Sequence, residues 1–292
     1  MTETVHKNIS SGKEHQKAML ELLEAFAGVC ERNDIPYMLY AGTLLGAVRH
    51  RGFIPWDDDI DVIMARRDYE RFLQAAARSL DPQRYFVQGE YSPHWPMFFS
   101  KLRLCNTACM EKYVPKDPEM HQGVFMDIFP YDNLSDGELP GKIQFWASKI
   151  VIARGLQQRG YATADILKKM AMAVSTLMPC AKLHGFVTNR EHARTKRVHT
   201  FFAAASSYRK NVFPREWFEE TVQLPFEGRT YPVSAHYHEL LTALYGDYMT
   251  PPDMAVRAVK EHNLLVDVFR PYTDYIGYQK TQKIYAYCRS IR

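Results

Sequence analysis

The chain has 292 residues, of which 46% are hydrophobic and 24% are charged, so it can bury a sizeable core and is not expected to be disordered. Its five cysteines are widely spaced and include no Cys-x-x-Cys pair, which argues against a disulfide framework or a thiolate zinc site and favours the reducing cytoplasm. The N-terminus lacks the apolar core of a secretory signal, and the best membrane candidate, Met170 to Ala181, has only 12 residues. A spanning helix needs about 20 apolar residues, so we expect a soluble protein.

The net charge of +4 conceals a basic segment. Between Gly141 and Arg215 there are 14 Lys and Arg residues against only Asp165 and Glu191, a local charge of +12, and the rest of the chain carries about −8. Such a segment favours an anionic partner: nucleic acid, a lipid surface, or an anionic glycan or lipid-linked sugar. Solvated faces of surface helices would explain the same charges.

The first 135 residues alternate between helical and extended patterns. Apolar residues at helical spacing predict an amphipathic helix over Gly12–Asp34, with Ser10 or Ser11 as its cap. Alternating polar and apolar residues predict a strand at Asp59–Met64. The other elements expected here are an extended run at 37–41, a short helix at 44–50, a helix at 66–80, and extended segments at 84–90, 98–105, 108–114 and 123–132.

The second half changes character. From about Glu138 to Tyr208 the pattern is helical and basic, and a hairpin is then expected at 221–233 with Glu227 and Gly228 in its turn. Two helices are expected around residues 237–253. We therefore predict a core over residues 1–137, a basic helical subdomain over 138–215, and a C-terminal part, 216–292, that packs back on the core.

Four aspartates lie within five positions, just ahead of an apolar run: Asp57, Asp58, Asp59 and Asp61. On a strand, side chains two apart share a face, so Asp59 and Asp61 would point together into a cleft. Carboxylates this close raise each other's proton affinity unless a cation neutralises them, and their oxygens suit Mg²⁺ or Mn²⁺. Asp127, which lies between apolar residues in another expected strand, would complete a three-carboxylate metal site.

Three alternatives compete with a metal site. A run of acids is often a solvated loop or a helix-cap cluster. A calcium loop would need Gly where Val62 stands and Glu where Asp68 stands, so it is disfavoured. Asp127 alone could be a structural residue that backbone donors satisfy.

The residues upstream of the acids suit a phosphate. Gly42 and Thr43, leading into a helix, can offer free backbone N–H groups. Arg49 shares a helix face with Gly42, and together with His50 and Arg51 it could help to neutralise a diphosphate. Glycines required for packing would explain the Gly-Thr-Leu-Leu-Gly stretch about as well.

The stretch YAGTLLGAVRHRGFIPWDDDIDV, Tyr40–Val62, closely resembles the signature of the LicD family, phosphotransferases named for the phosphorylcholine decoration of bacterial surface glycans. The resemblance recurs at RRDYERF, GVFMDIFPYDNL and FEGRTYPVSAHYHELLTALYGDYMTPP, and it is weakest in the basic segment. It implies an α+β fold: a nucleotidyltransferase-like mixed sheet with flanking helices and a basic helical insertion. The superfamily pattern maps onto Ala41-Gly42-Thr43, Asp59-Ile60-Asp61 and Met126-Asp127-Ile128, with Thr43 where Gly or Ser is usual.

The resemblance implies transfer of a substituted phosphate, above all phosphocholine from CDP-choline, to a hydroxyl of a cell-surface glycan precursor, with release of CMP. Asp59, Asp61 and Asp127 would hold one or two Mg²⁺ ions, with Mn²⁺ as a substitute. Asp57 or Asp58 would be the base that takes the acceptor proton, unless Asp58 bonds the loop backbone.

Further donor-binding residues follow from the same resemblance. Lys101 and Arg103, alternate residues of one expected strand, are candidates for the donor phosphates. A choline headgroup suits an aromatic cage, for which Trp56, Trp95 and Tyr113 are the candidates. His262 matches a C-terminal family position whose role the sequence does not define.

The expected partners are a CDP-alcohol donor and a glycan or lipid-linked saccharide acceptor. The basic segment 141–215 could bring the protein to the inner face of the membrane, whereas nucleic acid is a less favoured partner. Two alternatives stay open: CDP-glycerol, CDP-ribitol or nucleotidyl transfer in place of CDP-choline, and a non-catalytic protein that binds an anionic polymer.

Overall fold

The structure is a computed structural model that describes residues 10–111, 117–161, 163, 165–189, 194–203, 207–253 and 263–275. A mixed sheet of seven strands lies at its centre, in the order β1-β2-β6-β4-β3, with β7 pairing with β6 and β8 with β7. Strands β2 (Asp61–Ala65) and β6 (Phe125–Asn133) run parallel, and the other neighbours in this sheet are antiparallel. The other strands are β1 (Met38–Leu39), β3 (Tyr85–Gln88), β4 (Ser100–Leu104), β7 (Arg197–His199) and β8 (Val212–Pro214).

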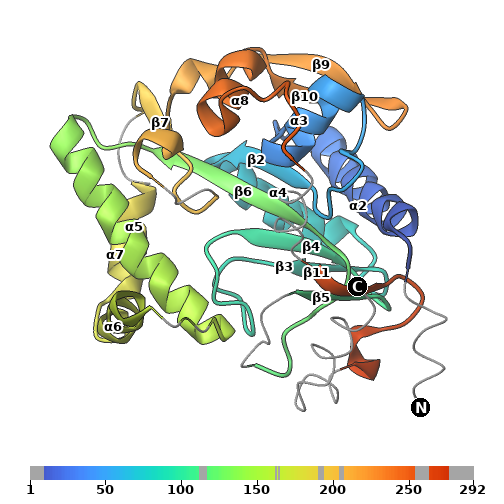
Figure 1. The fold of residues 1–292 in the computed structure, drawn as a ribbon, viewed down its shortest axis with the longest axis horizontal. Helices are drawn as coiled ribbons and strands as arrows, with labels where there is room; N and C mark the ends of the chain where they lie inside the picture. The colour runs from blue at the N-terminus through green and yellow to red at the C-terminus, as the bar shows by residue number, and fades with distance from the viewer. Residues whose placement is uncertain are drawn as a thin grey trace.

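Two long helices, α2 (Gly12–Arg32) and α4 (Arg66–Ser79), cover one face of this sheet (Figure 1). The α2 stripe of Met19, Leu22, Leu23 and Phe26 is fully buried, as expected of an amphipathic helix on a sheet. Ser11 caps α2 through a capping box with Glu14, which confirms the helix and one of its two predicted caps.

The C-terminal part returns to the core beside α3 (Ala41–His50) (Figure 1). Strands β9 (Thr221–Phe226) and β10 (Arg229–Ser234) form the predicted hairpin, and Glu227 and Gly228 both have the positive φ that its two-residue turn requires. Helix α8 (Tyr237–Tyr245) follows, but residues 246–253 form no second helix. Farther on, β11 (Asn263–Asp267) pairs with β5 (Ala108–Glu111) in a separate two-stranded sheet.

The basic segment is only partly helical. Helices α5 (Glu138–Arg159), α6 (Ile166–Ser175) and α7 (Cys180–Thr188) stand to one side of the sheet (Figure 1). Helices α5 and α7 share a separate apolar cluster that includes Phe145, Val151 and Val187. Residues 197–214, by contrast, contribute β7 and β8 to the main sheet, because β7 pairs with the end of β6. The expected boundaries at 138 and 215 stay a prediction.

Within the described ranges no single helix is long and apolar enough to cross a membrane. Helices α6 and α7 reach that length and composition only as a pair bent by 99°. The four cysteines that the structure describes, Cys30, Cys105, Cys109 and Cys180, are free thiols. Helices flank a mixed sheet, so the fold is α+β, as predicted.

Candidate functional site

The register of three neighbouring strands places Asp61, Asp127 and Lys101 side by side. Asp61 of β2 is the partner of Asp127 in the parallel ladder, and Lys101 of β4 lies opposite Asp127 in the antiparallel ladder. Partners across a ladder share a face of the sheet, with Cβ atoms about 5 Å apart. Together with Asp59, these three residues line a cavity of about 440 Å³, so residues far apart in sequence form one site.

Thr43 fixes the start of the strand that carries Asp61. The Asp61 backbone N–H donates to Thr43 Oγ1 over 2.8 Å, and the Asp61 carbonyl accepts from the Tyr40 N–H over 3.0 Å. Thr43 is buried and does not line the cavity. The hydroxyl at this position therefore holds the backbone of Asp61, while the predicted contact of Thr43 with the donor stays a prediction.

Gly42 allows a close approach of the acidic loop to the first turn of α3. A Cβ on Gly42 would lie 3.0 Å from Asp57 Oδ2, tighter than ordinary packing allows. The positive end of a helix dipole favours a carboxylate in this place. The first turn of α3 thus already has an anion beside it, and neither Gly42 nor Asp57 lines the cavity.

Asp58 joins the acidic loop to β11. Its Oδ2 accepts from the Asn263 backbone N–H over 3.1 Å and from the Asn263 amide over 3.2 Å. The Asp58 carbonyl accepts from the same amide over 3.0 Å. These contacts hold residues 57–60 as a loop, so β2 begins at Asp61, two residues later than the predicted strand. The Asp58 carboxylate was predicted to bond the backbone of its own loop, and in the structure it bonds the backbone of β11.

The carboxylates repel one another. Burial raises the pKa of Asp61 well above its usual range, and the neighbouring charges of Asp59 and Asp127 raise it further. Asp127 is balanced differently, because its Oδ1 lies 2.7 Å from Lys101 Nζ. An added cation would relieve the repulsion at Asp59 and Asp61.

The next question is whether these carboxylates are placed to hold a divalent metal ion. No group of three or more His, Cys, Asp or Glu side chains is placed to hold a metal ion in the part of the chain that the structure describes. Mg²⁺, however, is commonly held by one or two carboxylates together with substrate phosphates. Asp59 and Asp61 fit that arrangement, whereas the third ligand, Asp127, is paired with Lys101 and stays a prediction.

A buried basic cluster adjoins the acids. Glu111, at the end of β5, forms ion pairs with Lys101 over 3.8 Å, with Arg103 over 3.7 Å, and with Arg159 at the end of α5. Burial alone would raise the pKa of Glu111, but the three cations outweigh it and hold that pKa far below its usual range. Lys101, Glu111 and Arg159 all line the cavity, so it has an acidic side and a basic side.

Aromatic rings support these cations. Lys101 Nζ lies 3.2 Å from the centre of the Phe125 ring, and the guanidinium groups of Arg103 and Arg159 lie 5.8 and 5.1 Å from the Trp95 ring. Trp95 is fully buried. It faces guanidinium groups of the protein, which leaves its predicted place in a choline cage without support from this geometry.

Arg103 lies below the cavity. Its Nε donates to Gln88 Oε1 over 2.6 Å and its Nη1 to the Gly123 carbonyl over 2.8 Å, and it is fully buried. Arg103 does not line the cavity. In the structure, Arg103 joins β4 to β3 and to the segment just before β6. Phosphate binding by Arg103 stays a prediction.

Three further predicted donor-binding residues lie at the far end of α3. Arg49 Nη1 donates to the Tyr248 carbonyl over 2.8 Å, and the rings of His50 and Trp56 are 6.4 Å apart. None of the three lines the cavity. Their donor contacts stay predictions, and Tyr113 and His262 lie outside the described residues.

Sequence reasoning missed several cavity residues. Arg159 and Lys210 come from the basic segment, whose charge was the available signal, but spacing alone gave no reason to single them out. Tyr245, the last residue of α8, also lines the cavity. Burial raises the pKa of Tyr245 well above its usual range and the Asp61 charge adds to this, so its phenol stays protonated as a hydrogen-bond donor. Aromatic rings complete the wall: Tyr40, Phe99, Phe125, Phe129 and Phe202.

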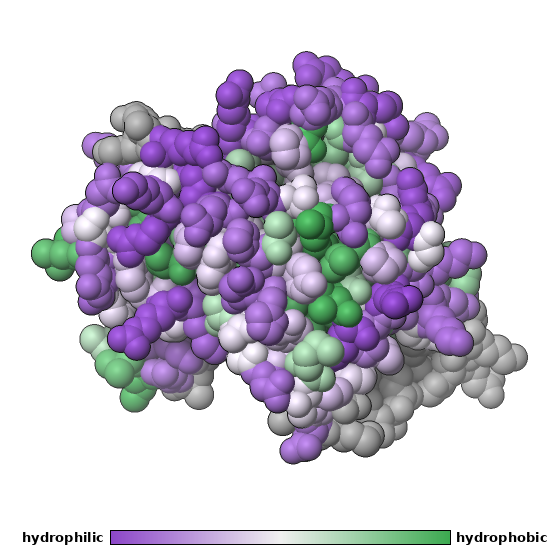
Figure 2. All heavy atoms as spheres, turned by 90° about the horizontal axis from the view of Figure 1, so that it is seen from above, coloured by the Kyte–Doolittle hydropathy of each residue, from purple (hydrophilic) through white to green (hydrophobic). Residues whose placement is uncertain are grey.

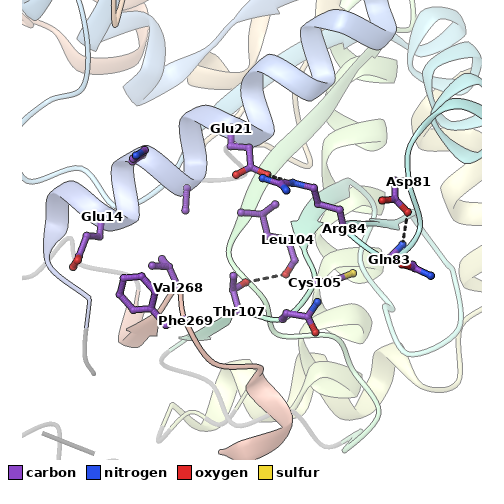
Figure 3. Close-up of a pocket in the computed structure, with 13 residues that line it drawn as sticks. Glu14, Glu21, Asp81, Gln83, Arg84, Leu104, Cys105, Thr107, Val268 and Phe269 are labelled. Carbon is purple, nitrogen blue, oxygen red and sulfur yellow. Dashed lines mark hydrogen bonds and ion pairs between the residues drawn. The ribbon is translucent and has the colours of Figure 1, made fainter. Parts of the chain in front are cut away.

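A larger cavity, of about 720 Å³, lies elsewhere, between α2, the β4–β5 turn and the end of β11 (Figure 3). Polar contacts join several of its labelled residues: Arg84 Nε lies 2.6 Å from Glu21 Oε1, and Thr107 Oγ1 donates to the Leu104 carbonyl. No predicted site residue lines it.

Comparison with known proteins places the chain. Residues 34–154 match the family model described as LicD/FKTN/FKRP, nucleotidyltransferase domain. The lipopolysaccharide cholinephosphotransferase LicD of Haemophilus influenzae is 31% identical over 251 residues, which cover 82% of this chain and 92% of that protein. An uncharacterized protein of Rickettsia prowazekii is 31% identical over 47% of this chain and 49% of its own length. Human ribitol 5-phosphate transferase FKRP is 38% identical over 74 residues, 24% of this chain and 15% of its own.

The fold and the site together define a nucleotidyltransferase-like domain: a mixed sheet with the Gly-Thr opening of a helix beside an Asp-x-Asp and a third aspartate on the next strand. Similarity to the Haemophilus protein extends over nearly the whole of both chains. The chain belongs to the LicD family, and it is an enzyme, a LicD-like phosphotransferase.

Proposed function

We propose that this protein transfers a substituted phosphate, above all phosphocholine from CDP-choline, to a hydroxyl of a cell-surface glycan precursor and releases CMP. The observation that carries the proposal is the row of Asp61, Asp127 and Lys101 across β2, β6 and β4, which gives one cavity an acidic and a basic side. The printed name of the Haemophilus relative, a lipopolysaccharide cholinephosphotransferase, supports both the headgroup and a glycan acceptor.

The reaction exchanges the phosphoanhydride bond of the donor for a phosphoester bond to the acceptor. An acceptor hydroxyl oxygen attacks the phosphorus that carries choline, the bond from this phosphorus to the bridging oxygen breaks, and CMP leaves with that oxygen. The hydroxyl proton passes to a base, for which Asp57 stays the prediction, although in the structure Asp57 lies against the first turn of α3 and does not line the cavity. Asp58 is less suited, because Asn263 already occupies its carboxylate.

Each side of the cavity has a part in this reaction. Mg²⁺ bound at Asp59 and Asp61, with Asp127 as the predicted third ligand, would neutralise the diphosphate and the leaving oxygen. Lys101 is bound to Asp127 and Glu111, so we assign it to holding Asp127 in place. Lys210, an exposed residue at the cavity, is suited to bind the donor phosphates.

A second candidate is transfer of ribitol phosphate from CDP-ribitol. The match to human ribitol 5-phosphate transferase favours it, although that match covers only 24% of this chain. Both donors carry the same CDP group, so the carboxylates would serve either one. The headgroup decides between them.

The test is to incubate the purified protein with CDP-choline, CDP-ribitol or CDP-glycerol, with extracted glycan acceptor, in Mg²⁺ or in EDTA. We expect CMP release and phosphocholine on the acceptor from CDP-choline with Mg²⁺, and loss of both in EDTA. Asp61→Asn should lower the rate by a factor of about 10² or more. Asp34→Asn is the matched control, because Asp34 is exposed and has a positive φ that Asn tolerates.

Other outcomes would redirect the proposal. CMP on the acceptor with free phosphocholine in solution would establish nucleotidyl transfer. Equal rates for wild type and Asp61→Asn would contradict the role of the acids. Undiminished transfer in EDTA would contradict Mg²⁺.

The proposal also covers where in the cell the enzyme works. We propose that the enzyme works in the cytoplasm, where CDP-activated donors would be available, and that it contacts the membrane that carries its acceptor. The free thiols Cys30, Cys105, Cys109 and Cys180 agree with a reducing compartment.

A further inference from the structure

Helix α6 exposes an apolar stripe to solvent. Leu167, Met170 and Val174 of α6 follow one another at steps of 3 and 4 residues, the spacing that normally faces a protein core, and Leu177 lies in the turn just after the helix. These side chains are instead between 54% and 85% exposed, and Ser175 is the buried residue of this helix. An apolar stripe left open in this way marks an interaction surface.

Helix α5 adds to the same part of the molecule. Leu139, Ile143 and Trp146, at i, i+4 and i+7, are between 52% and 71% exposed. Helices α5 and α6 pack together, and Arg154 of α5 donates to the Thr176 carbonyl at the end of α6 over 3.0 Å. Figure 2 shows apolar side chains in separate groups at the edge of the molecule where these helices lie. We call these exposed residues of the two helices the α5–α6 apolar surface.

Lysines accompany the α5–α6 apolar surface. Lys142, Lys168, Lys169 and Lys182 are exposed, although Lys142 pairs with Glu138 over 2.6 Å and Lys168 lies 3.9 Å from Asp165. Asp165 is the sole acid of segment 141–215 that lies within the described ranges, and its carboxylate caps α6 by accepting from the backbone N–H of Leu167 and Lys168. The surface therefore combines apolar area with positive charge, which opposes its pairing with a second copy of itself and suits an anionic surface.

We infer that the α5–α6 apolar surface docks on an anionic lipid bilayer, with α6 lying in the interfacial plane. Its apolar side chains would enter the acyl boundary while the lysines reach lipid phosphates. Helix α6 has 10 residues and would be only about 15 Å long, so it rests on the membrane and does not cross it. The α6 stripe contains no aromatic ring on which nucleic-acid bases could stack, which disfavours that polyanion.

Vesicle sedimentation with the full chain tests this docking without any measurement of activity. Wild type should sediment with phosphatidylcholine vesicles that contain phosphatidylglycerol, should sediment less in high salt, and should not sediment with phosphatidylcholine alone. The double variant Leu167→Gln/Leu177→Gln should bind roughly tenfold more weakly. The matched control, Met249→Gln/Phe269→Gln, changes two exposed apolar residues elsewhere and should bind as wild type does.

Fluorescence gives a second readout. Trp146 is 67% exposed, so its emission should shift to the blue when vesicles cover the surface, and Trp146→Phe should abolish the shift. The inference is overturned if wild type does not bind the anionic vesicles, or if both double variants bind equally well. It is also overturned if the α6 variant abolishes a dimer in light scattering and vesicle binding is absent, because the surface would then be an interface between two copies.

Discussion

Single residues set the geometry around Asp61. Thr43 accepts the hydrogen bond of the Asp61 N–H, Gly42 leaves room for Asp57, and Asn263 binds Asp58. Ala41, the first residue of α3, has a φ of 45°, which an L-residue adopts only at a cost in energy. The loop is thus built to hold charged side chains in place, and its chemistry depends on a few backbone contacts.

Thr43→Val should separate positioning from binding. Valine has the same shape but offers no acceptor, so the buried Asp61 N–H would lose its partner at a cost of about 1 to 3 kcal/mol in unfolding free energy. We expect CMP release to fall as well, because the strand start that carries Asp61 would loosen. Urea unfolding and CMP assays measure the two effects. Thr43→Ser should restore both; if serine fails as valine does, the methyl group of Thr43 and not its hydroxyl is what the site requires.

Asp61→Asn should stabilise the metal-free protein. The pKa of Asp61 is raised in the fold, so the metal-free wild type loses stability as pH rises through that raised pKa, and removing the charge should increase the free energy of unfolding at neutral pH. Mg²⁺ should raise the melting temperature of wild type and leave that of Asp61→Asn unchanged. Differential scanning calorimetry with and without EDTA measures both, with Asp34→Asn as the control. A variant less stable than the metal-free wild type would show that Asp61 is not under charge repulsion.

At the scale of elements, ion pairs join α5 to β4 and β5. Glu111 on β5 receives Arg159 from α5 and Lys101 and Arg103 from β4, and all four side chains are at most 15% exposed. A buried charge that loses its partner is costly, so this cluster makes the placement of α5 depend on β5. The basic side of the cavity therefore exists only when three elements dock together.

Glu111→Gln should destabilise the fold by about 3 kcal/mol or more, because three buried cations would lose their shared carboxylate. Because the pKa of Glu111 is held far below its usual range, this stabilisation is fully present above about pH 4.3 and is lost as pH falls below it. Urea unfolding at pH 7 measures the loss. Glu21→Gln, which removes a more exposed partner of Arg84, should cost less than about 1 kcal/mol, and a similar small cost at Glu111 would mean that the cluster does not stabilise the fold.

At the scale of the whole molecule, buried histidines tie the fold to pH. His199 is fully buried, its Nε2 lies 2.8 Å from the Val187 carbonyl, and burial lowers its pKa to about 4. Burial likewise lowers the pKa of His15 on α2 to about 4. Because the unfolded chain takes up these protons near pH 6.5 and the folded chain does not, stability is lost as pH falls from about 6.5 to 4.

The expected loss is up to roughly 3 kcal/mol per histidine over that range. Urea unfolding at pH 7 and pH 5 should show it, and His15→Gln should reduce the pH-dependent part by roughly a third, because burial also lowers the pKa of His121, to about 3. NMR of the imidazole groups should show both rings neutral at pH 5. Equal stability at the two pH values, or protonated rings at pH 5, would contradict the burial of neutral histidines.

The sequence by itself determined the local elements and the acids. Apolar periodicity located α2, alternation located β2, turn residues located the β9–β10 hairpin, and α4 and β6 were expected as a helical and an extended segment, because these patterns depend on neighbours within a few residues. Asp59, Asp61 and Asp127 stood out by residue type and spacing. Their resemblance to the LicD signature also predicted the family to which the chain belongs.

Only the tertiary structure decided which residues share the cavity. Strand register set Lys101 against Asp127, whereas the packing of α5, α8 and the segment before β8 brought Arg159, Tyr245 and Lys210 to the same cavity, which Arg103 does not line. The tertiary structure also decided where the helical pattern predicted for residues 138–208 stops: residues 197–199 form β7, because they pair with β6. Such pairings join residues far apart in sequence, and the free energy that selects them comes from packing and charge balance in three dimensions, which no local pattern encodes.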